Sequence, residues 1–202
     1  KPDLLQSWMY HADLYSSIIS SLLGIRNIVW GIRHTNLIVG KSKKNKNIIC
    51  KILARLSSII PAKIISCANH AIDVHSKIGY DKSKMIFIPN GYDFTRFSYD
   101  YEKSQLFLRK VNIDKSLPIL GSVGRYNPQK DHSNLLSALS KVSQKGIKFK
   151  CILVGKDLDS QNTKINNEID SLELKDHVIL LGSCNNIPDI MSSIDIHILA
   201  SS

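Results

Sequence analysis

The sequence predicts an α/β protein with two blocks of parallel β-sheet, both incomplete. Short apolar runs alternate with segments of helical periodicity along most of the chain. Apolar strands that are separated by helices form parallel sheets with helices on their faces. A strong turn signal, Pro89-Asn90-Gly91, opens a stretch without this alternation that ends near residue 114. The chain is therefore predicted to hold two Rossmann-like blocks.

The first block covers residues 1–95. Its predicted strands are 4–8, 27–31, 63–66 and 85–88, and its predicted helices are 12–23, 48–60 and 69–78. Both of the first two helices are amphipathic, and such a helix usually packs its apolar side on the core. The apolar sides are Leu14, Ile18, Ile19, Leu22 and Leu23 in the first helix and Ile48, Ile52, Leu56 and Ile59 in the second.

The second block covers residues 115–202, after a linker region at 96–114 that contains one helix around Leu106-Phe107-Leu108. Its predicted strands are 119–123, 149–154, 178–181 and 196–199, and its predicted helices are 131–144, 165–172 and 188–193. The chain opens without Met and closes on a fresh strand, so we expect it to be a piece of a longer protein.

The loop at 121–131 joins a predicted strand to a predicted helix, which Asp131 or Ser133 can cap. Gly121 and Gly124 allow a tight turn or a close approach to a ligand, and Arg125 and Lys130 bracket the loop with positive charge. A loop of this kind before a helix N-terminus suits an anion such as a diphosphate. The alternative is an ordinary turn with solvated basic residues.

The net charge of +10 is concentrated in one segment. Residues 14–72 contain nine of the 27 basic residues and no Asp or Glu. This segment suits an anionic partner, and Lys41–Arg55 has two readings: an element that binds an anionic membrane surface, or a solvated face. Nucleic acid is not expected as a partner, because the chain has neither an RNP-like aromatic motif nor a Cys/His finger.

The four cysteines are scattered and form no CxxC pair, which argues against a zinc ribbon or a redox motif and favours a reducing, cytosolic setting. His70 and His75 are five residues apart, off one helical face, so a metal site is not expected there. No apolar run approaches the length that spans a membrane.

Several segments together resemble the group 1 glycosyltransferases, the retaining family 4 enzymes of the GT-B fold that use sugar nucleotides. The segment Met85–Asp93 with Phe97 resembles their "IPNGVD…F" sequence, and Gly124-Arg125 through Lys130-Asp131 resembles their "GR…KD" diphosphate loop. Further segments are similar to their strands and N-domain sequences: Trp8–Ala12, Trp30–His34, Ile152–Gly155 and Val178–Gly182.

The resemblance implies a role for each candidate residue. Arg125, Lys130 and Gly124 would bind the diphosphate of a nucleotide-sugar donor, and Gly155, Gly182 and Ser183 would bring backbone groups near the nucleotide. The two cations would stabilise the charge that grows on the leaving phosphate, so neither a metal nor another cofactor is expected. His11 would be a polar contact near the transferred sugar. Arg33 is a candidate contact for the acceptor or a phosphate, with a surface salt bridge as the alternative.

The resemblance implies transfer of a hexose-type sugar, with retention, to a glycan or lipid-linked acceptor in bacterial surface polysaccharide synthesis. Such an enzyme would be cytoplasmic or peripheral on the inner face of the cytoplasmic membrane. The family's Gly-rich loop and its Glu-x7-Glu segment lie outside the 202 residues, so the piece alone is expected to be inactive. Two alternatives stay open: a nucleotide-sugar epimerase of the same fold and a non-enzymatic basic binding module.

Overall fold

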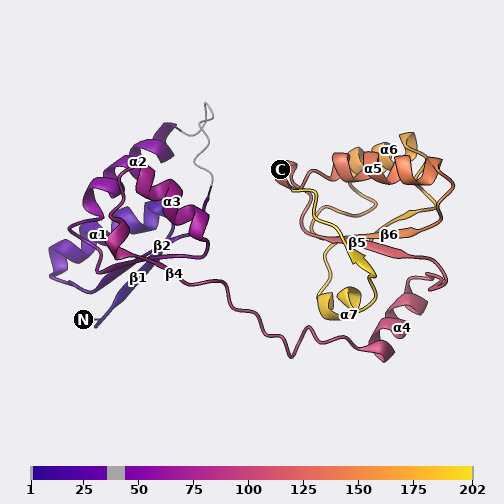
Figure 1. Ribbon diagram of the computed structural model, residues 1–202, viewed down its shortest axis with the longest axis horizontal. Helices are drawn as coiled ribbons and strands as arrows, with labels where there is room; N and C mark the ends of the chain where they lie inside the picture. The colour runs from indigo at the N-terminus through magenta and orange to yellow at the C-terminus, as the bar shows by residue number, and fades with distance from the viewer. Residues whose placement is uncertain (1, 36–43, 202) are drawn as a thin grey trace. The chain divides into compact units, whose positions relative to one another are not determined.

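The computed structural model describes residues 2–35 and 44–201 of the chain, except for the side chains of residues 44–46. The chain divides into two compact units, Lys1–Tyr92 and Asp93–Ser202, which we call unit 1 and unit 2 (Figure 1). The start of the predicted basic segment Lys41–Arg55 lies outside the described residues.

Unit 1 is a parallel sheet of four strands in the order β1-β2-β3-β4. Its elements in chain order are β1 (Leu5–Trp8), α1 (Tyr10–Leu23), β2 (Ile28–Ile32), α2 (Lys44–Leu56), β3 (Lys63–Ser66), α3 (Asn69–Lys77) and β4 (Met85–Phe87). The three helices lie together on one face of the sheet (Figure 1).

Unit 2 is a second parallel sheet, with the strand order β7-β6-β5-β8. Its elements are α4 (Tyr101–Lys110), β5 (Ile119–Val123), α5 (His132–Gln144), β6 (Lys150–Val154), α6 (Thr163–Ser171), β7 (Val178–Leu180), α7 (Ile187–Met191) and β8 (Ile196–His197). α5 and α6 cover one face, and α4 and α7 cover the other (Figure 1). The two parallel sheets confirm the predicted fold class.

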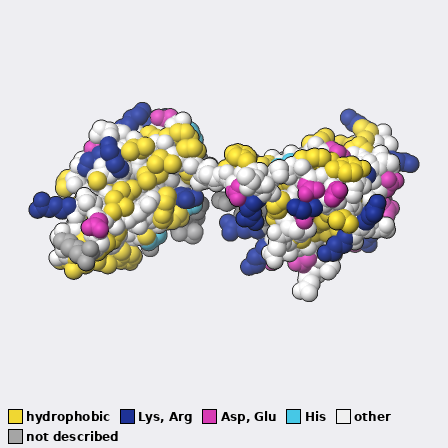
Figure 2. Space-filling view, turned by 90° about the horizontal axis from the view of Figure 1, so that it is seen from below, with side chains coloured by type: hydrophobic (Ala, Val, Ile, Leu, Met, Phe, Trp, Pro, Cys, Tyr) yellow, Lys and Arg dark blue, Asp and Glu magenta, His cyan; other side chains and the backbone are white. Residues whose placement is uncertain are grey.

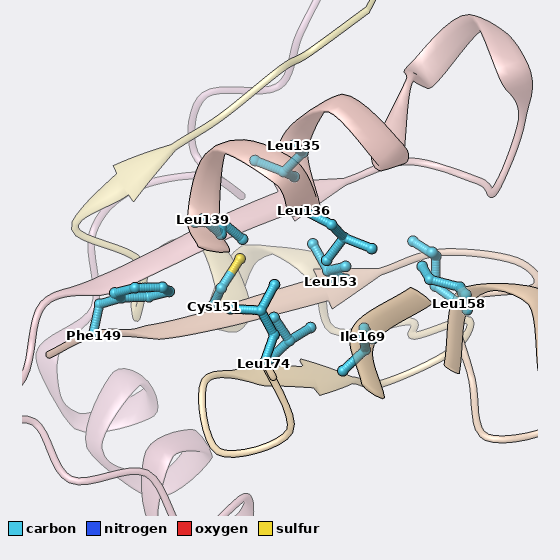
Figure 3. Close-up of a cluster of buried hydrophobic side chains, with 11 residues drawn as sticks. Leu135, Leu136, Leu139, Phe149, Cys151, Leu153, Leu158, Ile169 and Leu174 are labelled. Atoms are coloured by element: carbon cyan, nitrogen blue, oxygen red, sulfur yellow. The ribbon is translucent and has the colours of Figure 1, made fainter. Parts of the chain in front are cut away.

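The core of unit 2 is built around β6, which is buried on both faces. Cys151 and Leu153 point toward α5, where they meet Leu135, Leu136 and Leu139 (Figure 3). The alternate residues Ile152 and Val154 enter a second cluster with Phe107 and Leu108 of α4. All four β6 side chains are fully buried, and each large one contributes about 2 kcal/mol by leaving water. β6 therefore anchors the strand ends that carry the candidate site.

Most of the predicted apolar side of α1 is exposed, although Leu14 packs against the core. Ile18, Ile19, Leu22 and Leu23 are exposed, and the helix instead buries Tyr10, Asp13, Ser17 and Ser20. Hydrogen bonds explain the reversal: Trp30 Nε1 donates to Ser17 Oγ at 3.1 Å, and Ser17 Oγ donates in turn to the Asp13 carbonyl. Small serines let the helix approach the sheet closely, and these bonds satisfy the hydroxyl of Ser17.

The predicted apolar side of α2 is also wrong. Ile48, Ile52 and Ile59 are exposed, whereas Cys50, Leu53 and Ala54 are buried. These three residues also follow helical spacing, so the apolar pattern was compatible with two faces, and the one that packs against the sheet is the face of Cys50, Leu53 and Ala54. The helix ends at Leu56, and Ile59 lies beyond it.

α4 lies inside the predicted linker region 96–114 and packs against α7 within unit 2. The family resemblance further implies that residues 1–95 are the second half of an acceptor-side domain and residues 115–202 the first half of a nucleotide-sugar-binding domain, and this division stays a prediction.

Candidate functional site

Three loops of unit 2 meet at the carboxyl ends of its parallel strands. Gly124 follows β5, Gly155 follows β6 and Gly182 lies just beyond β7. Gly124 N donates to Val154 O at 2.8 Å, and Gly155 N donates to Gly182 O at 2.8 Å. Gly182 N donates in turn to Leu158 O at 2.7 Å. Backbone hydrogen bonds thus join the loops that contain the predicted donor-binding residues.

Gly155 has a φ of +151°, a conformation that side chains rarely adopt. A Cβ on this residue would lie 2.1 Å from Gly124 O, so only glycine lets the first two loops come this close. Because the N–H groups of Gly155 and Gly182 already have acceptors within the chain, these residues can offer a ligand a close surface but not these two donors.

The loop between β5 and α5 has a conformation fixed by its own polar side chains. Asn127 accepts from Gln129 N at 3.0 Å across the 3-10 turn Pro128–Lys130. Asp131 has a φ of +47° and caps α5 by accepting from Asn134 N at 3.3 Å. Its role as a cap, predicted as one of two choices, is confirmed. Strong local structure of this kind holds a loop in one shape.

The two predicted diphosphate-binding cations lie on this loop. Arg125 is exposed, and Lys130 is partly buried. Lys130 lies along Gly124, because a Cβ on Gly124 would be 3.5 Å from Lys130 Cε, and its Nζ donates to Ser201 Oγ at 3.4 Å. The stem of Lys130 therefore packs on Gly124, the residue that directly precedes Arg125. Ser183, the remaining predicted contact, is exposed just after Gly182.

His132 is the first residue of α5, and its side chain is buried at 3% exposure. Its ring packs on Tyr126 with centroids 5.6 Å apart, beside a cavity of about 250 Å³ at the N-terminal ends of α5 and α6. Burial, and then the charge of Lys130, lower the pKa of His132. Its spacing from Leu135, Leu136 and Leu139, on one helical face, was the sequence signal for this burial.

His11 lies in unit 1, in the first turn of α1, and its side chain is exposed. The turn before it is strained, because Met9 has a φ of 80° and a ψ of 147°. Met9 N donates to Gly31 O at 3.1 Å, which fixes this turn to the end of β2. Strain of this kind at a strand end is common at functional sites.

Asp13 lies directly below this turn, and the sequence analysis missed it. It is 1% exposed and accepts from Ser7 Oγ at 2.6 Å and from the Gly31 amide. Burial outweighs both hydrogen bonds and raises the pKa of Asp13 to about 7. The carboxyl group therefore ties β1, β2 and α1 together beneath His11.

Arg33 follows β2 and is exposed. Its guanidinium carbon lies 4.6 Å from the centre of the Trp8 ring, and Nη1 donates to Asn90 Oδ1 at 3.2 Å. The structure therefore gives Arg33 an aromatic and an amide partner. Both lie beside a cavity of about 230 Å³ in unit 1.

Two further searches cover the described residues only. Across residues 2–35 and 44–201, no three His, Cys, Asp or Glu side chains gather as a metal site would require. In the same part of the chain, every helix is too short or too polar to cross a membrane.

The family model described as glycosyl transferases group 1 matches residues 104–202. The whole chain is 24% identical over 204 aligned residues to an Escherichia coli protein, UDP-Gal:alpha-D-GlcNAc-diphosphoundecaprenol alpha-1,3-galactosyltransferase. The alignment covers 100% of this chain and 52% of that protein. The chain thus spans about half the length of this relative.

Two solved structures have the same fold at low sequence identity. Anabaena Alr3699/HepE, in complex with UDP-glucose, aligns with a TM-score of 0.81 at 18% identity, over 98% of this chain and 53% of that one. WaaG, a glycosyltransferase involved in lipopolysaccharide biosynthesis, aligns with a TM-score of 0.68 at 13% identity, over 95% of this chain and 59% of that one.

Proposed function

Because residues 104–202 form a group 1 glycosyltransferase domain within a GT-B fold, we propose that this chain is the central part of a sugar-nucleotide-dependent glycosyltransferase. The reaction is the transfer of a hexose-type sugar from a nucleoside diphosphate to a glycan or lipid-linked acceptor, with retention of the anomeric configuration.

The observation that carries the proposal is the loop between β5 and α5. It carries the exposed Arg125 and Lys130, whose side chain packs along Gly124, ahead of the N-terminus of a 13-residue helix. Arginine can grip two phosphate oxygens at once, and lysine acts as a point charge. As the bond between sugar and phosphate breaks, negative charge grows on the leaving diphosphate, and fixed cations stabilise it.

The other predicted residues take supporting roles. Gly155 and Gly182 shape the floor of the nucleotide site, and Ser183 lies at its exposed rim. His11 contacts the transferred sugar as a polar group and not as a base. Arg33 serves the acceptor. The donor's diphosphate needs no metal ion in this scheme, because the two cations supply the charge.

The relatives support the choice of substrates. The E. coli relative is named for UDP-Gal and a diphosphoundecaprenol-linked acceptor, and the Anabaena structure holds UDP-glucose. A UDP-hexose donor and a lipid-linked acceptor are therefore the first to test. A role in bacterial surface polysaccharide synthesis, and a position at the inner face of the cytoplasmic membrane, belong to the same proposal. The 202 residues alone transfer no sugar, since their relatives are about twice as long.

The test uses the full-length protein with UDP- and GDP-sugars and a GlcNAc-diphospho-lipid acceptor, with the product's anomeric configuration read by NMR. Arg125→Ala or Lys130→Ala is expected to lower kcat by about 100-fold, as loss of one donor to a developing charge does elsewhere. Conversion of the sugar nucleotide to an epimer without acceptor would instead identify an epimerase. Thermal protection by oligonucleotides, and not by sugar nucleotides, would favour the binding module.

A further inference from the structure

The cavity beside Arg33 in unit 1 lies on the face of the sheet away from its helices. Ser7 faces the helices, because it donates to Asp13 of α1, so the adjacent Trp8 points to the opposite face. Hydrophobic side chains gather on that face of unit 1 (Figure 2). The cavity there, about 230 Å³, opens between Trp8, Arg33 and the Asn90-Gly91 turn.

The position of Arg33 is set by neighbours on β1 and β2 and in the turn after β4. Gly31 has no side chain, and a Cβ there would lie 2.0 Å from Cε3 of Trp8, so the indole lies flat on β2. The guanidinium stacks over this indole at 4.6 Å, and the Asn90 amide oxygen accepts one of its five N–H groups. Stacking and one hydrogen bond orient the guanidinium plane before any ligand arrives.

The described lining of this cavity carries a positive charge and no acidic side chain. Among the described residues that line the cavity, Arg33 alone is charged. Three of its lining residues, Arg33, Ile65 and Cys67, belong to the segment 14–72, which has no Asp or Glu. An oriented guanidinium without a carboxylate partner is suited to bind a phosphate oxygen pair. The volume is below the range of about 300–1,000 Å³ that is usual for larger ligands, so it fits a phosphate group and not a whole sugar nucleotide.

We propose that the Trp8–Arg33–Asn90 cavity binds a phosphate group of the acceptor, and that the acceptor is therefore a phosphate-linked glycan. This inference rests on the proposed function. The donor's diphosphate already has Arg125 and Lys130 in unit 2, which leaves Arg33 in unit 1 for the other substrate. The E. coli relative's name contains an acceptor of this chemistry, a diphosphate-linked sugar.

The test measures transfer by the full-length protein with two acceptors, a GlcNAc-diphospho-lipid and an alkyl glycoside of GlcNAc without phosphate. Arg33→Ala is expected to raise KM for the diphospho-lipid by about 10- to 100-fold, the value of a hydrogen bond to a charged group. KM for the phosphate-free acceptor, KM for the donor, and donor hydrolysis without acceptor stay unchanged. Arg33→Lys rescues little, since lysine lacks the planar fork.

Arg26→Ala is the matched control, because this exposed arginine precedes the amino end of β2 and makes the same change in net charge. It leaves KM for both acceptors unchanged. Equal losses on both acceptors with Arg33→Ala would overturn the proposal and assign Arg33 a structural role. A raised donor KM would assign it to the donor and would equally overturn the proposal.

A direct binding measurement separates this inference from the proposed function. Trp8 is 41% exposed and Trp30 is fully buried, so a ligand beside Arg33 is expected to change the emission of Trp8. Saturable change with the diphospho-lipid, lost in Arg33→Ala and retained in Arg26→Ala, supports the cavity even if no sugar is transferred. If sugar is transferred but neither the Trp8 emission nor the acceptor KM depends on Arg33, the proposed function stands and phosphate binding in this cavity is rejected.

Discussion

The contact between Gly155 and Gly124 gives the sharpest test of how unit 2 is built. In Gly155→Ala, the new Cβ would lie 2.1 Å from Gly124 O and 2.5 Å from Gly124 C. Both are backbone atoms, so no side-chain rotation can relieve the clash. The strand end of β5 or β6 must move instead, and with it the hydrogen bond between Gly124 N and Val154 O.

Two terms give the size of the effect. Placing alanine at a positive φ costs about 1–2 kcal/mol, and forcing packed structure apart costs about 1–3 kcal/mol more. The control is Gly146→Ala, at a φ of +75° with no atom within 4 Å of the new Cβ, which carries the first term alone. The difference between the two variants therefore reports the contact, at about 1–3 kcal/mol, together with the extra backbone cost of alanine at +151°, which lies farther from the left-handed region than the +75° of Gly146.

Differential scanning calorimetry of both variants measures this difference. For a unit of this size, about 2 kcal/mol lowers Tm by roughly 8 °C or more. Gly155→Ala is also expected to raise KM for the donor, since Arg125 is the next residue after Gly124. Equal Tm values for the two variants would refute the close approach of the loops.

Three further predictions concern burial and charge. The pKa of Asp13 is raised to about 7, so the folded chain binds this proton more tightly than the unfolded chain, and unit 1 should lose stability as pH rises from about 4 to 7. The free energy of unfolding in urea, measured against pH, should show this slope in the native protein and a shallower slope in Asp13→Asn. Identical slopes would contradict the prediction. His132→Ala should lower the free energy of unfolding by about 2–3 kcal/mol through the cavity it leaves. His132→Leu should be neutral or stabilising, because leucine fills the space and removes the buried Nδ1, which has no protein partner among the described residues. Equal losses of unfolding free energy in the two variants would contradict this. In this chain, Leu22→Ser should change the free energy of unfolding by less than about 0.5 kcal/mol, because Leu22 is 81% exposed. Ser17→Leu should lower it by more than about 2 kcal/mol, because Ser17 is fully buried. Thermal melts with the opposite order would show that the apolar face of α1 packs on the core.

The strands were predictable because each is a short apolar run with turn residues beside it. β3 at Lys63–Ser66 and β5 at Ile119–Val123 have the predicted bounds. The buried side of α1 was not predictable, because it depends on Trp30, which lies 13 residues from its partner Ser17. Hydrophobic periodicity weighs side chains by type and carries no information on a hydrogen bond between distant residues.

The position of the candidate site was predictable from the sequence, but its contacts were not. Parallel strands place their carboxyl ends at one edge, so the meeting of the loops with Gly124, Gly155 and Gly182 followed from the order of elements. The hydrogen bonds between these loops could not be predicted from the order of elements, and neither could the partners of Arg33. Both depend on the distances between segments that are far apart in the sequence. Trp8 and Asn90 lie on β1 and just past β4, on either side of Arg33 in the sheet order.

The two units prepare their charged groups by the same physical means. In unit 2, the turn made by Asn127 and the cap made by Asp131 hold the loop that carries Arg125 and Lys130. In unit 1, an indole and an amide hold Arg33. A cation that is already oriented needs little reorganisation when negative charge arrives, and this is the condition under which fixed charges stabilise a leaving diphosphate most strongly. Substitutions that loosen these neighbours should therefore lower kcat or raise KM even where every charge is kept, and Asn127→Ala, which removes no charge, is the variant that isolates this effect.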